Sequence, residues 1–307
     1  MCALEIYVLN VGQGDTTILK TPQGNVLIID AYRPSKVKDA LDTIRPDGVI
    51  SHLVVTHPHS DHYGAVSRLL TDCTVGKVTL APFWFYAGTP AYHAIINRAQ
   101  SDHKPLHFLS GYERHYPDGG TFPDYPEGLF LELVGPPNYM FEDLQRENRG
   151  LLNPNHLSIL ARLNYGRFTM VFAADAQMEN WAHYDREGLL GQSCDVLKAA
   201  HHGSKRGTQW ERLERLGPEL VIVSSDPAAT HDLPDLVGSA TFLQYDEDEN
   251  HTVALTSATG TIKITVDADG SYEAVSFREG PSDLLSGLLP GPLPPTDWAS
   301  VLQLRMA

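Results

Sequence analysis

The densest group of chemically capable side chains in this chain lies between residues 57 and 62. The stretch reads His57-Pro58-His59-Ser60-Asp61-His62. Alternate residues of an extended loop point the same way, so His57 and His59 can hold one ion while Asp61 and His62 face a second position. Neutral imidazole and carboxylate groups suit Zn²⁺ and related first-row divalent ions. The alternative is a polar loop whose histidines only cap the next helix, but this density directly after an apolar stretch favours a metal site.

One loop cannot complete two coordination shells, so further ligands must come from the ends of other strands. Asp175 follows an apolar run and is placed to bridge two cations, the alternative being an N-cap of a helix that starts near Gln177. His201 and His202 follow another short apolar run, and the next residue, Gly203, allows the backbone to approach a bound group. We expect at least one of this pair to be a ligand and favour His202.

These residues follow apolar stretches with the length and composition of buried strands. Strands are expected over residues 4–9, 16–20, 26–29, 49–56, 129–134, 158–164, 168–173, 196–200, 220–224, 252–255 and 261–266. Helices are expected around residues 35–44 and 64–70, where apolar side chains have helical spacing. The last two strands look like a pair. Two strand-rich halves that deliver polar residues at strand ends predict an α/β (α+β) protein folded as a four-layer αββα sandwich.

We expect one domain over residues 1–280, with an insertion near residues 82–150 where the strand and helix patterns loosen. The insertion contains the aromatic run Phe83-Trp84-Phe85-Tyr86 and several tyrosines among Gly and Pro. These rings could stack a base, enclose an apolar group or only pack the insertion onto the sandwich. Residues 281–307 are rich in Pro, Gly and Leu, and we expect a tail that wraps the domain.

The charge balance is strongly acidic. Acidic residues outnumber basic ones 38 to 23, a net charge of -15, and no basic block is present beyond Lys198, Lys205 and Arg206. Such a surface repels a long nucleic-acid backbone, so duplex nucleic acid is not an expected partner. A small or short single-stranded phosphoester is compatible with this charge, because a bound metal ion can dominate the local field.

The remaining composition indicates a cytoplasmic protein that does not contact membranes. The three cysteines form no C-x-x-C pair and no even framework, which fits a reducing compartment. The chain shows no signal-like segment and no apolar run near the roughly 18 residues that a spanning helix needs.

Several motifs together resemble a known family. They are Asn10-Val11-Gly12-Gln13-Gly14-Asp15, Asp30, the run from His57 to His62, Asn155 with Ser158, the strand into Asp175, and Leu197-Lys198-Ala199-Ala200-His201-His202-Gly203-Ser204. They look like the metallo-β-lactamase superfold, and within it like the soluble domain of the ComEC competence-protein family and its stand-alone relatives. The resemblance covers about residues 3–270. It implies an αββα sandwich with a dinuclear site at the shared edge of its two sheets.

The resemblance also implies which residues hold the two metals. It assigns His57 and His59 to one metal and Asp61, His62 and His202 to the other, with Asp175 between them. Where enzymes of this fold that act on β-lactams, thioesters or RNA add a histidine, this chain has Asn155, as members of the resembled group often do. His156 is the substitute candidate, the alternative being a ring that faces solvent or substrate.

Other positions depart from the family pattern or flank the site. Ala174 stands where relatives commonly have Gly, which removes some backbone freedom. Asp30 is followed by Ala31 and Tyr32 rather than by an early glycine, so it is expected to anchor a metal-binding histidine and not to bind metal itself. Asp15 is expected to hold the loop that carries His57, with a simple Asx turn as the alternative.

The chemistry expected from these residues is hydrolysis. A water bound by two cations, zinc by preference or manganese, loses a proton near neutral pH and can attack phosphorus or a carbonyl carbon. Asp61 and His201 are the expected catalytic side chains, and Lys205 could also offset charge. The expected substrate contacts are Asn155, His156, Ser204, Lys205 and His231, although His231 could equally be an ordinary loop histidine. A phosphodiester or other phosphoester is favoured; the alternatives are a carboxylic ester, lactone or amide hydrolase, or an inactive binding protein of this fold.

Overall fold

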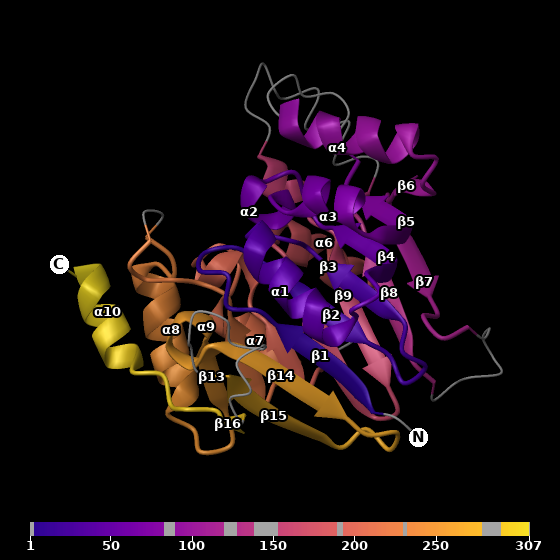
Figure 1. Ribbon diagram of the computed structural model, residues 1–307. Coiled ribbons are helices and arrows are strands. Elements are labelled where there is room, and N and C mark those ends of the chain that lie inside the picture. Colours follow the sequence, from indigo (N-terminus) through magenta and orange to yellow (C-terminus); the bar gives the residue numbers. More distant parts are fainter. Residues whose placement is uncertain are drawn as a thin grey trace.

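The computed structural model describes residues 3–82, 90–119, 128–137, 153–188, 193–229, 232–277 and 290–306. Within them, two sheets face one another and helices cover their outer faces (Figure 1). The expected αββα sandwich is therefore confirmed.

The first sheet contains the strands of the N-terminal half together with the last strands of the chain. Its members are β1 (Leu4–Val8), β2 (Thr17–Lys20), β3 (Val26–Ile29), β4 (Val49–Val55), β5 (Thr74–Leu80), β6 (Leu106–Phe108), β14 (Thr261–Val266), β15 (Tyr272–Phe277) and β16 (Gly291–Pro292). Within the described residues their order is β16-β15-β14-β1-β2-β3-β4-β5-β6. Strands β3 to β6 are parallel, so residues that follow β3 and β4 meet at one edge of the sheet.

The second sheet is built from the middle of the chain. Its members are β7 (Tyr112–His115), β8 (Phe130–Val134), β9 (Leu160–Tyr165), β10 (Phe168–Phe172), β11 (Val196–Lys198), β12 (Leu220–Val223) and β13 (Thr252–Leu255). Over the described ranges the order is β13-β12-β11-β10-β9-β8-β7, and β10 to β13 are parallel. Their carboxyl ends lie together and deliver Asp175, His201 and His202.

The helices divide between the two outer faces. They are α1 (Pro34–Ile44), α2 (Ser60–Tyr63), α3 (Val66–Asp72), α4 (Pro90–Ser101), α6 (Met178–Glu187), α7 (Trp210–Leu216), α8 (Leu236–Asp246), α9 (Thr256–Thr259) and α10 (Trp298–Met306), with 3₁₀ turns η1 (Pro154–Leu157) and η2 (Ala200–Gly203). The alternation of side chains shows the layers. Met170 and Phe172 of β10 pack into the core between the sheets, whereas Val171 packs outward with Trp181 and other residues of the helical layer.

The expected pairing of the last two strands is wrong. β13 pairs with β12 in the second sheet, and β14 pairs with β1 in the first. The short helix α9 and Gly260 carry the chain from one sheet to the other. An apolar run of strand length indicates that a strand exists but does not identify its neighbour, so a hairpin and a crossover look alike in sequence.

Two regions expected to be loosely patterned contain regular elements. Residues 90–115 provide α4, β6 and β7, and the last two are edge strands of the two sheets. Tyr92 is fully buried there and its hydroxyl donates to the Ala81 carbonyl at 3.1 Å. The run from Phe83 to Tyr86 lies outside the described residues. Near the C-terminus, β16 extends the first sheet and α10 packs beside α8.

Among the described residues, no helix combines the length and the hydropathy that crossing a bilayer requires.

Candidate metal centre

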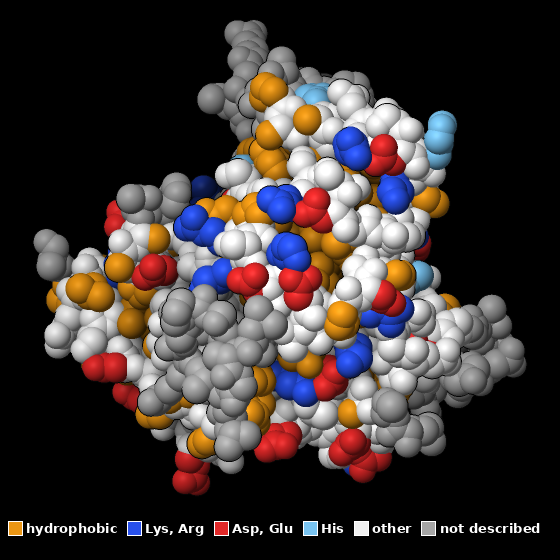
Figure 2. All heavy atoms as spheres, viewed as in Figure 1, with side chains coloured by type: hydrophobic (Ala, Val, Ile, Leu, Met, Phe, Trp, Pro, Cys, Tyr) orange, Lys and Arg blue, Asp and Glu red, His pale blue; other side chains and the backbone are white. Residues whose placement is uncertain are grey.

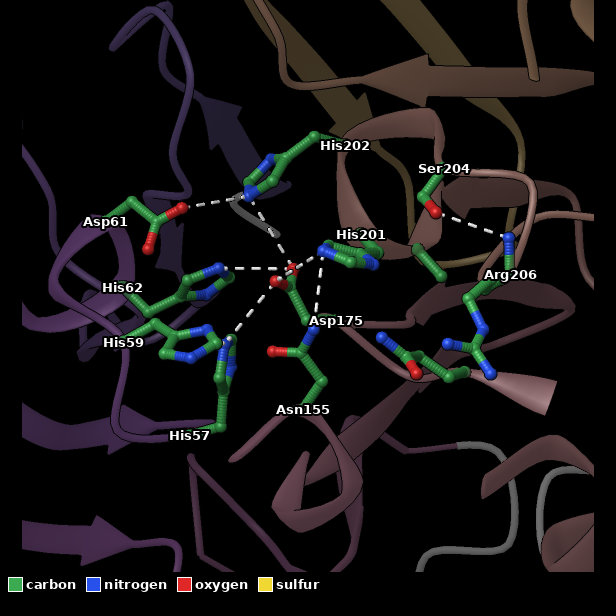
Figure 3. Close-up of polar contacts among 12 residues, drawn as sticks. His57, His59, Asp61, His62, Asn155, Asp175, His201, His202, Ser204 and Arg206 are labelled. Atoms are coloured by element: carbon green, nitrogen blue, oxygen red, sulfur yellow. Dashed lines mark hydrogen bonds and ion pairs between the residues drawn. The ribbon is translucent and has the colours of Figure 1, made fainter. Parts of the chain in front are cut away.

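The site lies where the carboxyl ends of β4, β10 and β11 converge (Figure 3). β4 leads into His57 and His59, and α2 carries Asp61 and His62. Asp175 follows β10. His201 and His202 lie in the turn after β11. Segments more than a hundred residues apart in sequence thus contribute to one cluster.

Three groups of side chains in this cluster have the spacing of metal ligands. One of them, Asp15, His62 and Asp175, overlaps the other two. The potential ligand atoms of His57, His59 and Asp175 lie within 4.8 Å of one another, and those of Asp61, His62 and His202 do so as well. Asp175 reaches both groups. Its Oδ2 is 3.5 Å from His57 Nε2, and its Oδ1 is 3.2 Å from His62 Nε2 and 3.6 Å from His202 Nε2. This grouping has the division, and the shared carboxylate, that the family resemblance implies.

The orientation of two imidazoles is set by partners behind them. His62 Nδ1 is 2.7 Å from Asp30 Oδ2, and His202 Nδ1 is 2.8 Å from the Ser224 carbonyl oxygen. Both partners are acceptors, so Nδ1 carries the hydrogen and Nε2 of the neutral ring presents a lone pair.

These lone pairs are directed at a carboxylate. His62 Nε2, His202 Nε2 and Asp175 Oδ1 are buried and make no hydrogen bond. Electron pairs that face one another at such distances require a positive charge between them. The pKa of His62 also indicates that the site favours a positive charge. Although burial opposes it, the Asp175 and Asp30 carboxylates raise the pKa of His62 well above its ordinary value. The residues therefore fit a divalent cation.

The pKa values of neighbouring residues in the site are also shifted. Burial and the nearby His57 lower the pKa of His59 to about 4. Burial lowers the pKa of His201. Burial by itself raises the pKa of Asp61, but His202, whose Nε2 lies 3.3 Å from Asp61 Oδ2, and the nearby His62 hold the pKa of this carboxyl below its ordinary value. His59 and His201 are thus neutral and Asp61 is ionised near pH 7, the protonation states that metal ligation requires.

Sequence reasoning anticipated Asp30 but missed the residue that fixes it. The Thr56 amide and hydroxyl donate to the two Asp30 carboxylate oxygens at 2.8 and 2.7 Å. Asp30 can then hold His62 in one orientation, which is the anchoring role predicted for it. The position of Thr56 in the sequence, directly before His57, could have identified it.

A buried ion pair contacts residues of the cluster. Lys198 donates to the Asp15 carboxylate, and the two side chains are 3% and 8% exposed. Asp15 Oδ1 lies 3.7 Å from His202 Nδ1, and the Asp15 amide donates to the Asp61 carbonyl at 3.0 Å. Asp15 thus contacts the loop that it was expected to hold. Lys198 is buried and does not join Lys205 and Arg206 in a surface cluster.

The backbone around the site adopts left-handed conformations at residues other than glycine. The φ angles are 57° at Asp30, 47° at Ala174, 48° at His201 and 51° at His202. Such conformations cost an L-residue roughly 1–2 kcal/mol, and they concentrate at functional sites. Ala174 therefore occupies a conformation that suits the glycine common in relatives.

The residues predicted to contact substrate differ in where the structure places them. Asn155 reaches the site, with its amide nitrogen 3.3 Å from His201 Nε2, and His201 Nε2 is 3.7 Å from Asp175 Oδ2. His156 does not, because its Nε2 lies 3.4 Å from Glu179 Oε2, and it belongs to none of the candidate ligand groups in the described residues. The Ser204 hydroxyl accepts from the Arg206 amide. Lys205 is exposed, and His231 lies outside the described residues.

The cluster opens into a cavity of about 640 Å³. Its lining includes the potential ligands His59, Asp61, Asp175 and His202 together with His201. The other lining residues are Gly12, Gln13, Tyr32, Arg33, Ser60, Asp226, Ala229 and Leu233. A small substrate can therefore reach the candidate metal positions.

Comparison with known proteins agrees with this geometry. The metallo-beta-lactamase superfamily model matches residues 9–225, so the chain belongs to that superfamily. The resemblance seen in the motifs is therefore confirmed, and the His and Asp groups of the site are candidate ligands for divalent metal ions. Among solved structures, Tm1679, described as a metal-dependent hydrolase of the beta-lactamase superfamily, has a TM-score of 0.51 at 12% identity, covering 89% of this chain and 99% of that one.

Two curated relatives match at low identity. ComE operon protein 3 from Bacillus subtilis (strain 168) is 21% identical over 240 residues, which cover 72% of this chain and 28% of that protein. Recombination protein 2 from Haemophilus influenzae (strain ATCC 51907 / DSM 11121 / KW20 / Rd) is 22% identical over 227 residues, with 72% and 24% covered. The chain therefore spans about a quarter of the length of these relatives.

Proposed function

We propose that this chain hydrolyses phosphoesters, with a compact or single-stranded phosphodiester as the preferred substrate. In this proposal His57 and His59 would hold one divalent cation, Asp61, His62 and His202 would hold a second, and Asp175 would be available to both. Zinc is the first choice for such nitrogen and carboxylate donors, and manganese the second. When bound, these ions would supply Lewis acidity and lower the pKa of water at the site.

The residues of the chain have separate tasks in this scheme. Asp30 and the Ser224 carbonyl keep the Nε2 lone pairs of His62 and His202 directed at the site. Burial lowers the pKa of His201, so its ring is neutral near pH 7 and can accept a proton. The Asp175 carboxylate, 3.7 Å from His201 Nε2, would stabilise the charge of the protonated ring. Asn155 holds the His201 ring through its side-chain amide.

The observation that carries the phosphoester assignment is Arg33 in the cavity wall. Its guanidinium carbon lies 4.7 Å from the centre of the Tyr32 ring, and both residues line the cavity with the metal cluster. The Tyr32 ring packs closely on Gly14, where an added Cβ would lie only 2.3 Å from it. An arginine held against an aromatic ring suits an anionic substrate.

The choice of a diester rests on two further points. One relative is named a recombination protein, which favours nucleic-acid chemistry. The net charge of -15 opposes a long duplex, because 38 acidic residues outnumber the 23 Lys and Arg residues that could neutralise its backbone. On the face shown in Figure 2, Lys and Arg side chains are interspersed with Asp and Glu. A short single strand or a small diester satisfies both points.

The test compares substrates at fixed metal. Apoprotein reloaded with Zn²⁺ or Mn²⁺ is assayed on bis-p-nitrophenyl phosphate, p-nitrophenyl phosphate, p-nitrophenyl acetate, a short single-stranded oligonucleotide and a plasmid. We expect the phosphodiesters to be cleaved faster than the monoester and the acetate, and the plasmid to be a poor substrate. Fast acetate cleavage with an inert phosphodiester would establish the carboxylic-ester alternative, and rapid plasmid degradation would refute the charge argument.

A further inference from the structure

The C-terminal helix α10 lies outside the part of the chain that the family model matches, yet it reaches the cavity wall. It packs along α8 at the left of Figure 1. Trp298 anchors it, because its side chain is buried and its indole nitrogen donates to the Val253 carbonyl at 2.8 Å. Val301 is also buried against the outer helical layer. The position of α10 therefore does not depend on the last residues of the helix.

One residue of this helix, Arg305, binds the turn formed by residues 232–235. Its Nε donates to the Pro234 carbonyl at 2.7 Å and its Nη2 to the Leu233 carbonyl at 2.9 Å. Nη1 lies 3.3 Å from Asp232 Oδ1. The Arg305 side chain is only 8% exposed. A planar guanidinium with several fixed donors can thus hold three successive residues in one arrangement.

The same turn forms part of the cavity and touches the metal-site segment. Leu233 lines the cavity. Pro234 packs on Gly203, the residue after His202, so closely that a Cβ at Gly203 would lie 2.9 Å from the proline Cβ. The Asp235 carboxylate accepts hydrogen bonds from the Lys205 and Gly238 amides, both at 2.8 Å. A continuous set of contacts therefore runs from α10 through the turn to the His201–Ser204 region.

We propose that Arg305 is a positioning residue for the substrate cavity. It holds the 232–235 turn against Gly203, so that Leu233 forms a preordered wall beside the metal cluster. Without it the turn is ordered in only a fraction of molecules, and the apparent affinity for substrate falls by that fraction. The metal ligands and their partners lie on other elements, so the chemical step and metal retention are preserved. The kinetic part of this proposal rests on the proposed function.

The experiment compares three variants of the full chain. Arg305→Ala removes the three Arg305 contacts with the turn and leaves the hydrogen bond from the Ser225 hydroxyl to the Leu233 carbonyl. Arg305→Lys keeps the positive charge but has one nitrogen donor in place of three. Gln303→Ala is the matched control, because Gln303 is exposed on the same helix. With bis-p-nitrophenyl phosphate we expect Arg305→Ala to raise KM about tenfold, with kcat within about twofold and metal content unchanged. Arg305→Lys should give an intermediate KM and Gln303→Ala the wild-type value.

A second measurement does not depend on activity. Hydrogen exchange of the Lys205 and Gly238 amides reports whether Asp235 stays in place. We expect both to exchange at least about tenfold faster in Arg305→Ala, partly faster in Arg305→Lys and unchanged in Gln303→Ala. Unchanged exchange overturns the proposal, as does an unchanged KM or a loss of kcat with KM intact. Faster exchange in a protein whose wild type cleaves no phosphoester supports the positioning role and refutes the proposed function instead. If Arg305→Ala does not fold, Arg305→Lys alone decides by the same criteria.

Discussion

Two histidine clusters of this molecule differ in what surrounds their rings. The metal-site cluster contains His57, His59, His62, His201 and His202. The edge cluster contains His52 on β4, His107 on β6 and His115 on β7, where the edge strands of the two sheets lie near one another. Each cluster gathers at least three imidazoles, so histidine number alone does not separate them.

The charges beside the rings separate them. In the metal-site cluster, His62 and His202 face the buried carboxylate of Asp175, and the pKa of each is raised against the effect of burial. In the edge cluster, His52 is bonded to the Thr79 hydroxyl at 2.8 Å and its ring packs edge-on against His115. Burial, together with the neighbouring His115 and Lys77, lowers the pKa of His52 to about 2.

The edge cluster is thus built to keep its central imidazole neutral, and the carboxylate of Glu113, which lies beside His107, also contacts Lys77. The candidate metal groups among the described residues include none of the three edge histidines. The difference teaches that a metal site requires carboxylates without other partners and rings held in one tautomer. Local histidine density is not sufficient.

The largest expected effect comes from the shared carboxylate. Asp175→Asn removes a negative charge that faces both ligand groups, so cations held by these two groups would repel one another without that compensation. We expect loss of most bound metal and a fall in kcat/KM of more than about 100-fold, because even the partners of metal ligands are worth 10–100-fold. Elemental analysis and the diester assay measure the two effects, and the wild type should carry close to two divalent ions.

His156→Ala is the control for that variant, since the His156 ring lies beside Glu179 and not in either ligand group. Its activity and metal content should stay within about twofold of wild type, a range typical of changes away from a metal and its partners. An active Asp175→Asn beside a dead His156→Ala would show that the shared ligand is assigned to the wrong residue.

A smaller loss of metal affinity is expected when the His62 ring is no longer held in one orientation. Asp30→Ala removes the carboxylate that accepts from His62 Nδ1, and metal affinity should fall about 10–100-fold. Thr79→Val makes the equivalent change in the edge cluster, because it removes the hydroxyl bonded to His52. Chelator competition should show unchanged metal affinity in Thr79→Val. Equal losses in both variants would mean that the two clusters do not differ in the way described.

The edge cluster should appear in the pH dependence of stability. His52 has a pKa near 6.5 when unfolded and about 2 when folded, so the unfolded chain binds the proton first and stability falls as pH drops below 6.5. Between pH 6.5 and 4.5 this residue alone should remove about 2 kcal/mol. Urea unfolding should show a correspondingly smaller loss over that interval in His52→Gln. Parallel pH curves for the variant and the wild type would contradict the buried, neutral state.

Much of the metal-site cluster could be predicted because its residues follow recognisable apolar strands. His57 and Asp175 each come directly after such a strand, and parallel strands bring their carboxyl ends together. Val26–Ile29 and Thr261–Val266 were predicted with the bounds that the structure has. These are short, continuously apolar or alternating runs between turn signals, for which sequence patterns are most informative.

The side chains that contact those residues were harder to predict from the sequence. Lys198 looked like part of a surface cluster, and only the fold shows that it is buried against Asp15, 183 positions away in sequence. The edge histidines belong to strands β6 and β7, whose three and four residues leave too little periodicity to recognise. The role of Arg305 depends on a helix docking against a turn about 70 residues earlier, which no local pattern encodes.

The smallest expected effect concerns the strain that only the metal-site cluster carries. The edge histidines lie on regular strands, whereas Ala174 precedes Asp175 with a φ of 47°. Ala174→Gly relieves a left-handed conformation worth roughly 1–2 kcal/mol but adds about 0.5–1 kcal/mol of backbone entropy to the unfolded chain. We expect a net gain of up to about 1 kcal/mol in the free energy of unfolding, measured in urea, with metal content retained.

Ala173→Gly is the matched control for Ala174→Gly. Ala173 is buried without a positive φ, so the same change there removes packing and adds only the entropic cost, and stability should fall. A loss of stability in Ala174→Gly as large as that in Ala173→Gly would mean that the Ala174 methyl group stabilises the fold by more than its backbone conformation costs.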